Sequence, residues 1–220
     1  INKVIKSNVV KSYSEIGILV RNNISLEFVS NGLDVPFRVF DEDPLAVRNT
    51  NVCNLFSQLL KFRYDDCHRI NDVVEYVNIL NSIQDIKLSS MRVLISELND
   101  KDNELLSKHI VHVVEKVLGV VVGCSEKELL NEICLDSSLL KHYKLIDDNE
   151  VQVMTLHKSK GLEFELVYHL DLYDWVHPKR QFVQGCYDVV FDNWEQELNL
   201  HFVGITRAKN YCVLVTSTNR

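Results

Sequence analysis

The sequence predicts an α/β fold in which a parallel sheet is flanked by helices and interrupted by a mostly helical insertion. Short apolar runs rich in β-branched residues occur near both ends of the chain, as in buried parallel strands. A helical pattern separates the first two runs, which gives the strand–helix–strand order of a parallel sheet. Between the two terminal parts, residues 52–146 carry apolar residues mostly at helical spacing.

The N-terminal part is expected to contribute two strands and the helix between them. Asn23 is the predicted N-cap of that helix, and Gly32 is expected to end it. Arg21 directly follows the first strand, where it is either a polar cap or a contact for a ligand. The predicted elements are a short helix over residues 1–13, a strand over 16–20, a helix over 24–31 and a strand over 35–40.

The middle of the chain predicts a helical insertion. Amphipathic helices are expected over residues 52–60, 73–80, 94–98, 105–118 and 129–135. Ser125 is the expected N-cap of the last helix. His109, His112 and Glu115 share a helical face, a spacing that metal ligands and ordinary solvated residues both show. Because no Cys-x-x-Cys pair occurs, we expect no metal site. We assign residues 1–48 and 147–220 to the sheet domain and 49–146 to the insertion.

Residues 151–172 (VQVMTLHKSKGLEFELVYHLDL) predict a strand, a polar loop and a second apolar segment. The loop places His157 and Lys158 after the first strand, where ligand groups collect in α/β folds. Gly161 permits a positive φ or a close backbone approach to a ligand. A surface turn with solvated lysines is the alternative interpretation.

A second charged segment follows at residues 195–209, where helical spacing leads into a strand predicted over 211–216 and expected to be buried. Leu198, Phe202 and Ile205 lie on one side of the predicted helix, and Arg207 lies at its end. A cation there either interacts favourably with the helix macrodipole or donates bidentate hydrogen bonds to a phosphate.

Composition narrows the class of protein. The 220 residues are sufficient for one large domain or for one domain with an insertion. A net charge of −7 argues against a generally basic nucleic-acid binder, so any such contact is local. The six cysteines are scattered, and we expect them to be reduced in a cytoplasmic protein. No apolar run is long enough to span a membrane. Because the chain begins at Ile1 without methionine, we expect a fragment of a longer protein.

Three of these segments resemble sequence motifs of superfamily 1 DNA helicases of the UvrD/Rep/PcrA type. IGILVRNN (residues 16–23) resembles motif IV, TLHKSKGLEF (155–164) resembles motif V, and FVGITRAK (202–209) resembles motif VI. The resemblance covers residues 13–40 and 151–217. It implies that the predicted sheet is the second RecA-like domain of the C-terminal region of such a helicase. Phe202 and Asn199 depart from the pattern, which commonly has tyrosine and a basic residue there.

The resemblance also implies roles for individual residues. Arg207 matches the catalytic arginine finger, Arg21 assists it at the nucleotide phosphates, and Glu163 matches the acidic residue that binds the ribose. The residues assigned to ATP are therefore Arg21, Gly161, Glu163 and Arg207. The residues assigned to single-stranded DNA are Thr155, His157 and Lys158 of motif V and, from the stretch 175–180 after it, His177, Lys179 and Arg180.

The glycine-rich phosphate loop GxxxxGK[ST] is absent from the chain. We therefore expect ATP and Mg²⁺ to be held mainly by a preceding RecA-like domain, and the chain alone to lack ATPase activity. The full protein is expected to be an ATP-dependent 3′-5′ DNA helicase with single-stranded DNA, that N-terminal domain, and a nuclease or repair protein as partners. The alternative is a helicase-like binding module of a nuclease or phage-defence complex without its own ATPase, which the short insertion favours.

Overall fold

The computed structural model describes residues 2–5, 10–80, 88–100, 102–173, 176–181, 183–185, 190–191 and 193–216. The chain divides into two compact units. Unit 1 comprises Ile1–Asp41 and Ile146–Arg220, and unit 2 comprises Glu42–Leu145. Trp175, which begins the predicted DNA-contacting stretch 175–180, lies outside the described residues.

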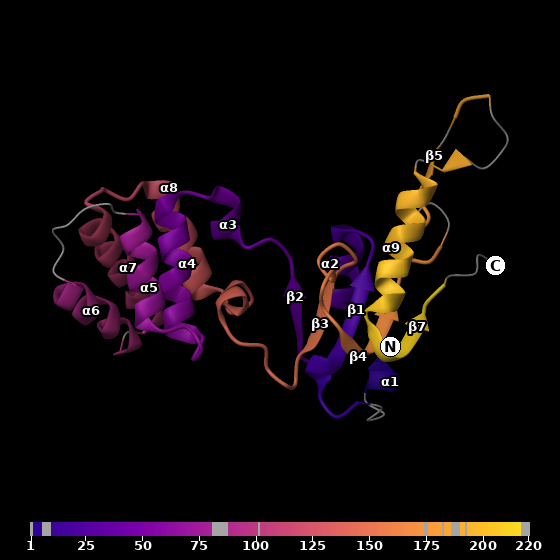
Figure 1. The fold of residues 1–220 in the computed structure, drawn as a ribbon, viewed down its shortest axis with the longest axis horizontal. Coiled ribbons are helices and arrows are strands. Elements are labelled where there is room, and N and C mark those ends of the chain that lie inside the picture. The colour runs from indigo at the N-terminus through magenta and orange to yellow at the C-terminus, as the bar shows by residue number, and fades with distance from the viewer. Residues whose placement is uncertain are drawn as a thin grey trace. The chain divides into compact units, whose positions relative to one another are not determined.

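Unit 1 is built on a five-stranded sheet in the order β2-β3-β1-β4-β7 (Figure 1). Its strands are β1 (Ile16–Val20), β2 (Phe37–Phe40), β3 (Val151–Thr155), β4 (Phe164–His169) and β7 (Ala208–Leu214). Every neighbouring pair is parallel. The register places Val20 opposite Thr155 and Leu19 opposite His169, so these strands end at one common edge. The predicted parallel α/β sheet is confirmed.

Helices cover both faces of this sheet because successive strand residues point to opposite sides. Ile18 packs in one apolar cluster with Leu26 of α2 (Asn23–Asn31). The next residue, Leu19, packs in a second cluster with Leu200 of α9 (Trp194–Thr206). The remaining elements of unit 1 are α1 (Asn2–Ile5), a 3₁₀ turn (Tyr13–Glu15), and the antiparallel pair β5 (Arg180–Gln181) and β6 (Val190–Phe191).

Several local expectations were wrong. The N-cap of α2 is Asn22, whose side-chain oxygen accepts a hydrogen bond from the Ser25 N–H at 2.9 Å. Of the helix expected over residues 1–13, the described part contains only the short α1, Asn2–Ile5. Residues 6–9 lie outside the described residues. The last strand, β7, is not buried: it forms an edge of the sheet, with Tyr211 and Leu214 about half exposed.

Unit 2 is helical and has a single apolar core. Its elements are α3 (Pro44–Arg48), α4 (Asn51–Tyr64), α5 (Ile70–Leu80), α6 (Leu88–Ser96), a 3₁₀ turn (Glu97–Asp100), α7 (Asn103–Leu118), α8 (Cys124–Leu135) and a second 3₁₀ turn (Leu139–Tyr143). Helix α8 begins after Gly123 rather than at Ser125. The Glu126 carboxylate accepts a hydrogen bond from the Gly123 N–H at 3.3 Å, so the N-cap lies two residues before Ser125.

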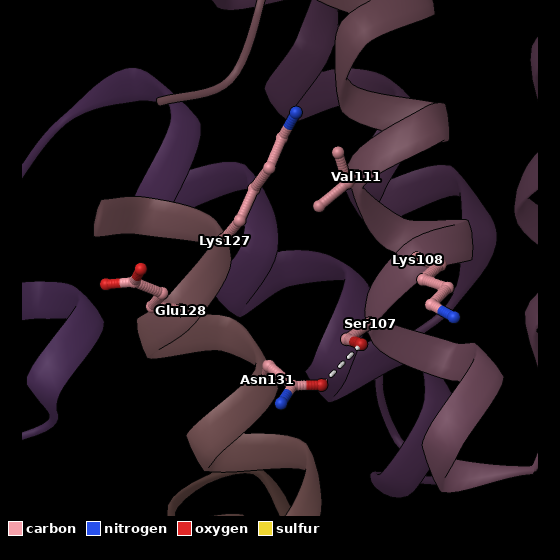
Figure 2. Close-up of a pocket in the computed structure, with 6 residues that line it drawn as sticks. All are labelled: Ser107, Lys108, Val111, Lys127, Glu128 and Asn131. Carbon is pink, nitrogen blue, oxygen red and sulfur yellow. Dashed lines mark hydrogen bonds between the residues drawn. The ribbon is translucent and has the colours of Figure 1, made fainter. Parts of the chain in front are cut away.

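A surface pocket of about 440 Å³ lies between α7 and α8 (Figure 2). The Ser107 hydroxyl donates to the Asn131 side-chain oxygen across it at 3.1 Å. No residue assigned to ATP or DNA lines this pocket. Nearby, His109 contacts the Leu94 carbonyl through Nε2 at 3.1 Å, and His112 is exposed. Among the described helices, none combines the length and the apolar character needed to cross a membrane.

Candidate functional site at two edges of the sheet

Helix α9 turns an unexpected face to the sheet. Its buried residues are Glu197, Leu200 and Gly204. A Cβ atom at position 204 would lie 2.6 Å from Cδ2 of His169, so the glycine permits the close approach of α9 to β4. Leu198, Phe202 and Ile205, the apolar residues on one side of the predicted helix, are instead 53%, 65% and 37% exposed.

Arg207 lies at the amino-terminal edge of the sheet, where α9 ends and β7 begins. Its Nε donates to the Val203 carbonyl and its Nη1 to the Leu162 carbonyl, both at 3.1 Å. The Arg207 carbonyl in turn accepts the Phe164 N–H at 2.8 Å. These bonds hold Arg207 beside the exposed loop that contains Gly161 and Glu163. The structure thus brings together three of the four residues assigned to ATP.

The loop is shaped by local polar contacts. Gly161 adopts a φ of +87°, a left-handed conformation that strains any residue with a Cβ. Ser159 is fully buried, and its hydroxyl donates to the Leu156 carbonyl at 2.8 Å. This inward turn leaves His157 and Lys158 exposed just beyond the carboxyl end of β3. Thr155, the last residue of β3, is half-buried.

Arg21 lies at the carboxyl edge of the sheet, directly after β1. Its backbone N–H donates to the Asp171 carboxylate at 2.7 Å, and Asp171 adopts a left-handed φ of 64°. Its guanidinium group forms an ion pair with Glu197 at 2.7 Å. Arg21 is therefore engaged with the first turns of α9.

The structure does not bring Arg21 and Arg207 together. In the register, Phe164 pairs with Ala208 at one end of β4, while His169 pairs with Leu19 near the other end. Five residue steps at about 3.3 Å each separate the two ends by roughly 16 Å. Arg21 shares its edge instead with Thr155 and the start of the motif V loop.

The remaining residues assigned to DNA lie between β4 and β6. His177 is 3% exposed, and its Nδ1 lies 2.6 Å from a carboxylate oxygen of Glu197. Lys179 is exposed, and Arg180 is half-buried in β5. The imidazole of His177 thus faces the protein, whereas the lysine that follows faces solvent.

A cluster of three histidines adjoins this contact and was missed in the sequence. His169 and His201 rings have centroids 5.0 Å apart, and the His177 ring lies 5.6 Å and 5.8 Å from them. His201 Nδ1 is 3.1 Å from His169 Nε2. Two signals were available: Glu197 and His201 are four residues apart on a helix, and His169 interrupts an apolar strand.

Burial controls the protonation of this cluster. The pKa of His169 is lowered to about 4, mainly by burial and also by the neighbouring His201 and His177, which together outweigh the hydrogen bond to the Leu170 carbonyl. Burial also lowers the pKa of His201. Burial alone would raise the pKa of Glu197, but hydrogen bonds from Arg21 and His177 hold it below its ordinary value. At neutral pH, His169 is therefore uncharged and Glu197 is ionised.

The sequence signature described as the UvrD-like helicase C-terminal domain matches residues 45–219, which is most of the chain. The chain belongs to this family. The UvrD-like domain is 24% identical over 196 residues to the ATP-dependent DNA helicase Rep of Buchnera aphidicola subsp. Acyrthosiphon pisum, covering 86% of the chain and 28% of the relative. The resemblance inferred from the three motifs is confirmed.

Two further relatives support the same family. The ATP-dependent DNA helicase PcrA of Staphylococcus aureus is 26% identical over 130 residues, which are 56% of this UvrD-like domain and 17% of PcrA. The ATP-dependent DNA helicase Rep of Escherichia coli is 41% identical over 61 residues, which are 28% of the domain and 8% of Rep. The chain therefore spans well under a third of each of these relatives.

Proposed function

We propose that this UvrD-like domain is the C-terminal RecA-like part of an ATP-dependent 3′-5′ DNA helicase, to which it contributes an arginine finger and contacts to single-stranded DNA. The observation that carries the proposal is the placement of Arg207 beside Gly161 and Glu163. Two backbone carbonyls hold its guanidinium group at the sheet edge, next to an exposed carboxylate and a glycine without a side chain.

This group suits the chemistry of phosphoryl transfer. Negative charge spreads over the γ-phosphate oxygens in the transition state, and an arginine from a facing domain stabilises it. Arg207 would supply that charge, and Glu163 would accept hydrogen bonds from the ribose. The phosphate loop and the Mg²⁺ ligands belong to the preceding domain of the full protein. Arg21 lies at the opposite edge of the sheet, where it is bonded to Glu197 and Asp171. Its contact with ATP stays a prediction.

The opposite edge supports contacts with a DNA strand. His157, Lys158 and Lys179 are exposed there and offer donors to phosphates. Thr155 and Arg180 are their neighbours in the sequence. His177 would contact a phosphate only if its ring moved away from Glu197. The acidic composition makes this contact weak and salt-sensitive, because each phosphate contact releases counterions.

One segment connects the two edges. Since β3 and β4 are both parallel to β1, residues 156–163 run from the carboxyl end of β3 to the amino end of β4. His157 and Lys158 begin this segment, and Gly161 and Glu163 end it. Binding or hydrolysis of the nucleotide at one end of the segment can therefore change the contacts with DNA at the other end.

The test is Arg207→Lys in the full protein that contains this domain, measured as steady-state ATPase with saturating single-stranded DNA. Arginine fingers contribute about 10³ to 10⁵ in rate, or roughly 4 to 7 kcal/mol. Lysine lacks the planar fork, so we expect Arg207→Lys to lose nearly as much as Arg207→Ala. Arg92→Lys, at an exposed arginine of unit 2 that bonds to Asn71, is the matched control and should retain full turnover.

A folded Arg207→Lys protein with turnover within about threefold of the parent, under ~1 kcal/mol in barrier, would assign Arg207 a structural role. The isolated chain gives the baseline and should show no turnover. If the full protein also shows none with its arginines intact, the alternative of a binding module without a motor is the correct one.

A further inference from the structure

The histidine cluster beside Glu197 has the composition of a metal site. We propose that His169, His177 and His201 bind one divalent transition-metal ion, of which Zn²⁺ is the representative. This is the only group of three or more potential ligands that converge in the described part of the chain. None of the three histidines is assigned to ATP, whereas His177 is also among the residues assigned to single-stranded DNA. The proposal does not depend on the helicase function.

The three rings come from three different elements that the fold brings together. His169 ends β4, His177 follows in the loop before β5, and His201 lies on α9. One ligand nitrogen from each lies within 4.8 Å of the others. A tetrahedral ion with Zn–N bonds of about 2.0–2.1 Å needs nitrogens about 3.3 Å apart. His201 Nδ1 and His169 Nε2 are already at 3.1 Å, so mainly the His177 ring must move.

Two of the histidines already have the outer partners that metal ligands use. His177 Nδ1 lies 2.6 Å from the Glu197 carboxylate, and His169 Nδ1 lies 3.1 Å from the Leu170 carbonyl. In metal sites, the non-ligating ring N–H is donated to a carboxylate or a backbone carbonyl. Each partner favours a proton on Nδ1 and leaves the Nε2 lone pair for an ion. The ion pair with Arg21 fixes the carboxylate itself.

The cluster has one protected side and one accessible side. His169 is fully buried and His177 nearly so, which shields the bonds from water, while His201 is half-buried. A pocket of about 350 Å³ is lined by His177, His201 and Glu197 and gives an ion an entry path. It also leaves space for water or an anion as a fourth ligand, as in zinc sites with three protein ligands.

The donor set indicates the kind of ion. Three imidazoles without a carboxylate suit Zn²⁺, Cu²⁺ or Ni²⁺ and disfavour Mg²⁺ and Ca²⁺, which prefer oxygen. The competing account is a purely structural hydrogen-bonded chain from His201 through His169 to the Leu170 carbonyl. That chain does not involve His177, and it predicts no stoichiometric metal uptake.

The experiment uses the 220-residue chain without a histidine tag, stripped of metal and titrated with Co²⁺. We expect one equivalent to bind with visible d–d absorption, to be displaced by Zn²⁺, and to be unaffected by excess Mg²⁺. His201→Asn should weaken binding by at least about tenfold, because it removes a ligand at the least buried position. His112→Asn, at an exposed histidine outside the cluster, should bind as the parent does.

A second variant guards against misfolding. Glu197→Gln keeps all three ligands but weakens the partner of His177, and loss of such a partner costs about 10–100-fold in metal affinity. Circular dichroism verifies the fold of each variant. The proposal is overturned if the parent takes up no stoichiometric Co²⁺. It is equally overturned if folded His201→Asn and Glu197→Gln both bind as tightly as the His112→Asn control.

Discussion

The two units bury different kinds of residues. Among the described residues of unit 2, the buried polar side chains are Ser57 and Ser107 alone. Unit 1 buries a charged and polar set that includes Arg38, Glu150, Gln152, Ser159, His169, Asp171, His177 and Glu197. A buried polar group is costly unless it is paired, and those of unit 1 include the ion pairs Arg38–Glu150 and Arg21–Glu197. The contrast separates a unit with an almost wholly apolar core from a unit whose interior depends on paired polar groups.

The strongest test of this contrast removes core volume from unit 2. Leu59 is fully buried there, and Leu59→Ala should lower the free energy of unfolding by about 2–5 kcal/mol because a cavity remains. Leu105 in the same unit is 53% exposed, so Leu105→Ala should change it by less than about 0.5 kcal/mol. Urea denaturation followed by circular dichroism measures both. Equal effects would show that the core of unit 2 is not the close-packed one described.

A smaller effect is expected from overpacking unit 1. A Cβ at Gly17 of β1 would lie 2.6 Å from the Phe164 ring, so Gly17→Ala should cost about 1–3 kcal/mol. Gly32→Ala is the control, since its Cβ would be at ordinary contact distance, 3.6 Å from the Val29 carbonyl oxygen. Adding Phe164→Leu to Gly17→Ala should recover part of the loss. Thermal melts measure both variants. Equal Tm values for Gly17→Ala and Gly32→Ala would contradict the close packing of Gly17 against Phe164.

The smallest effects concern the helix N-caps, one in each unit. Asn22 caps α2 in unit 1, and Thr50 caps α4 in unit 2 by accepting the Cys53 N–H at 3.1 Å. Alanine at either position should cost about 1 kcal/mol. Amide hydrogen exchange shows which part of the chain each substitution destabilises. We expect each variant to raise the exchange rate only within its own unit. Exchange raised across both units by either variant would mean that they unfold as one.

The sequence predicted the sheet because its strands are β-branched and bounded by polar loops, a signal that does not depend on distant contacts. It did not identify the buried face of α9, because the apolar residues at helical spacing, such as Phe202, are exposed. The actual contact uses Gly204 and Glu197, whose roles depend on His169 and Arg21 in other elements. For the same reason, three histidines separated by 8 and 24 positions gave no local pattern.

Helix α9 has a mechanical consequence. Glu197 near its start is tied to Arg21 at one edge of the sheet, and Arg207 at its end is tied to Leu162 at the other. Ten residues at about 1.5 Å each make a stiff rod of roughly 15 Å between these two ties. Between these two ties, Gly204 lets α9 approach His169 of β4 closely. A single helix therefore joins the two edges of the sheet at which the residues assigned to ATP and to DNA lie.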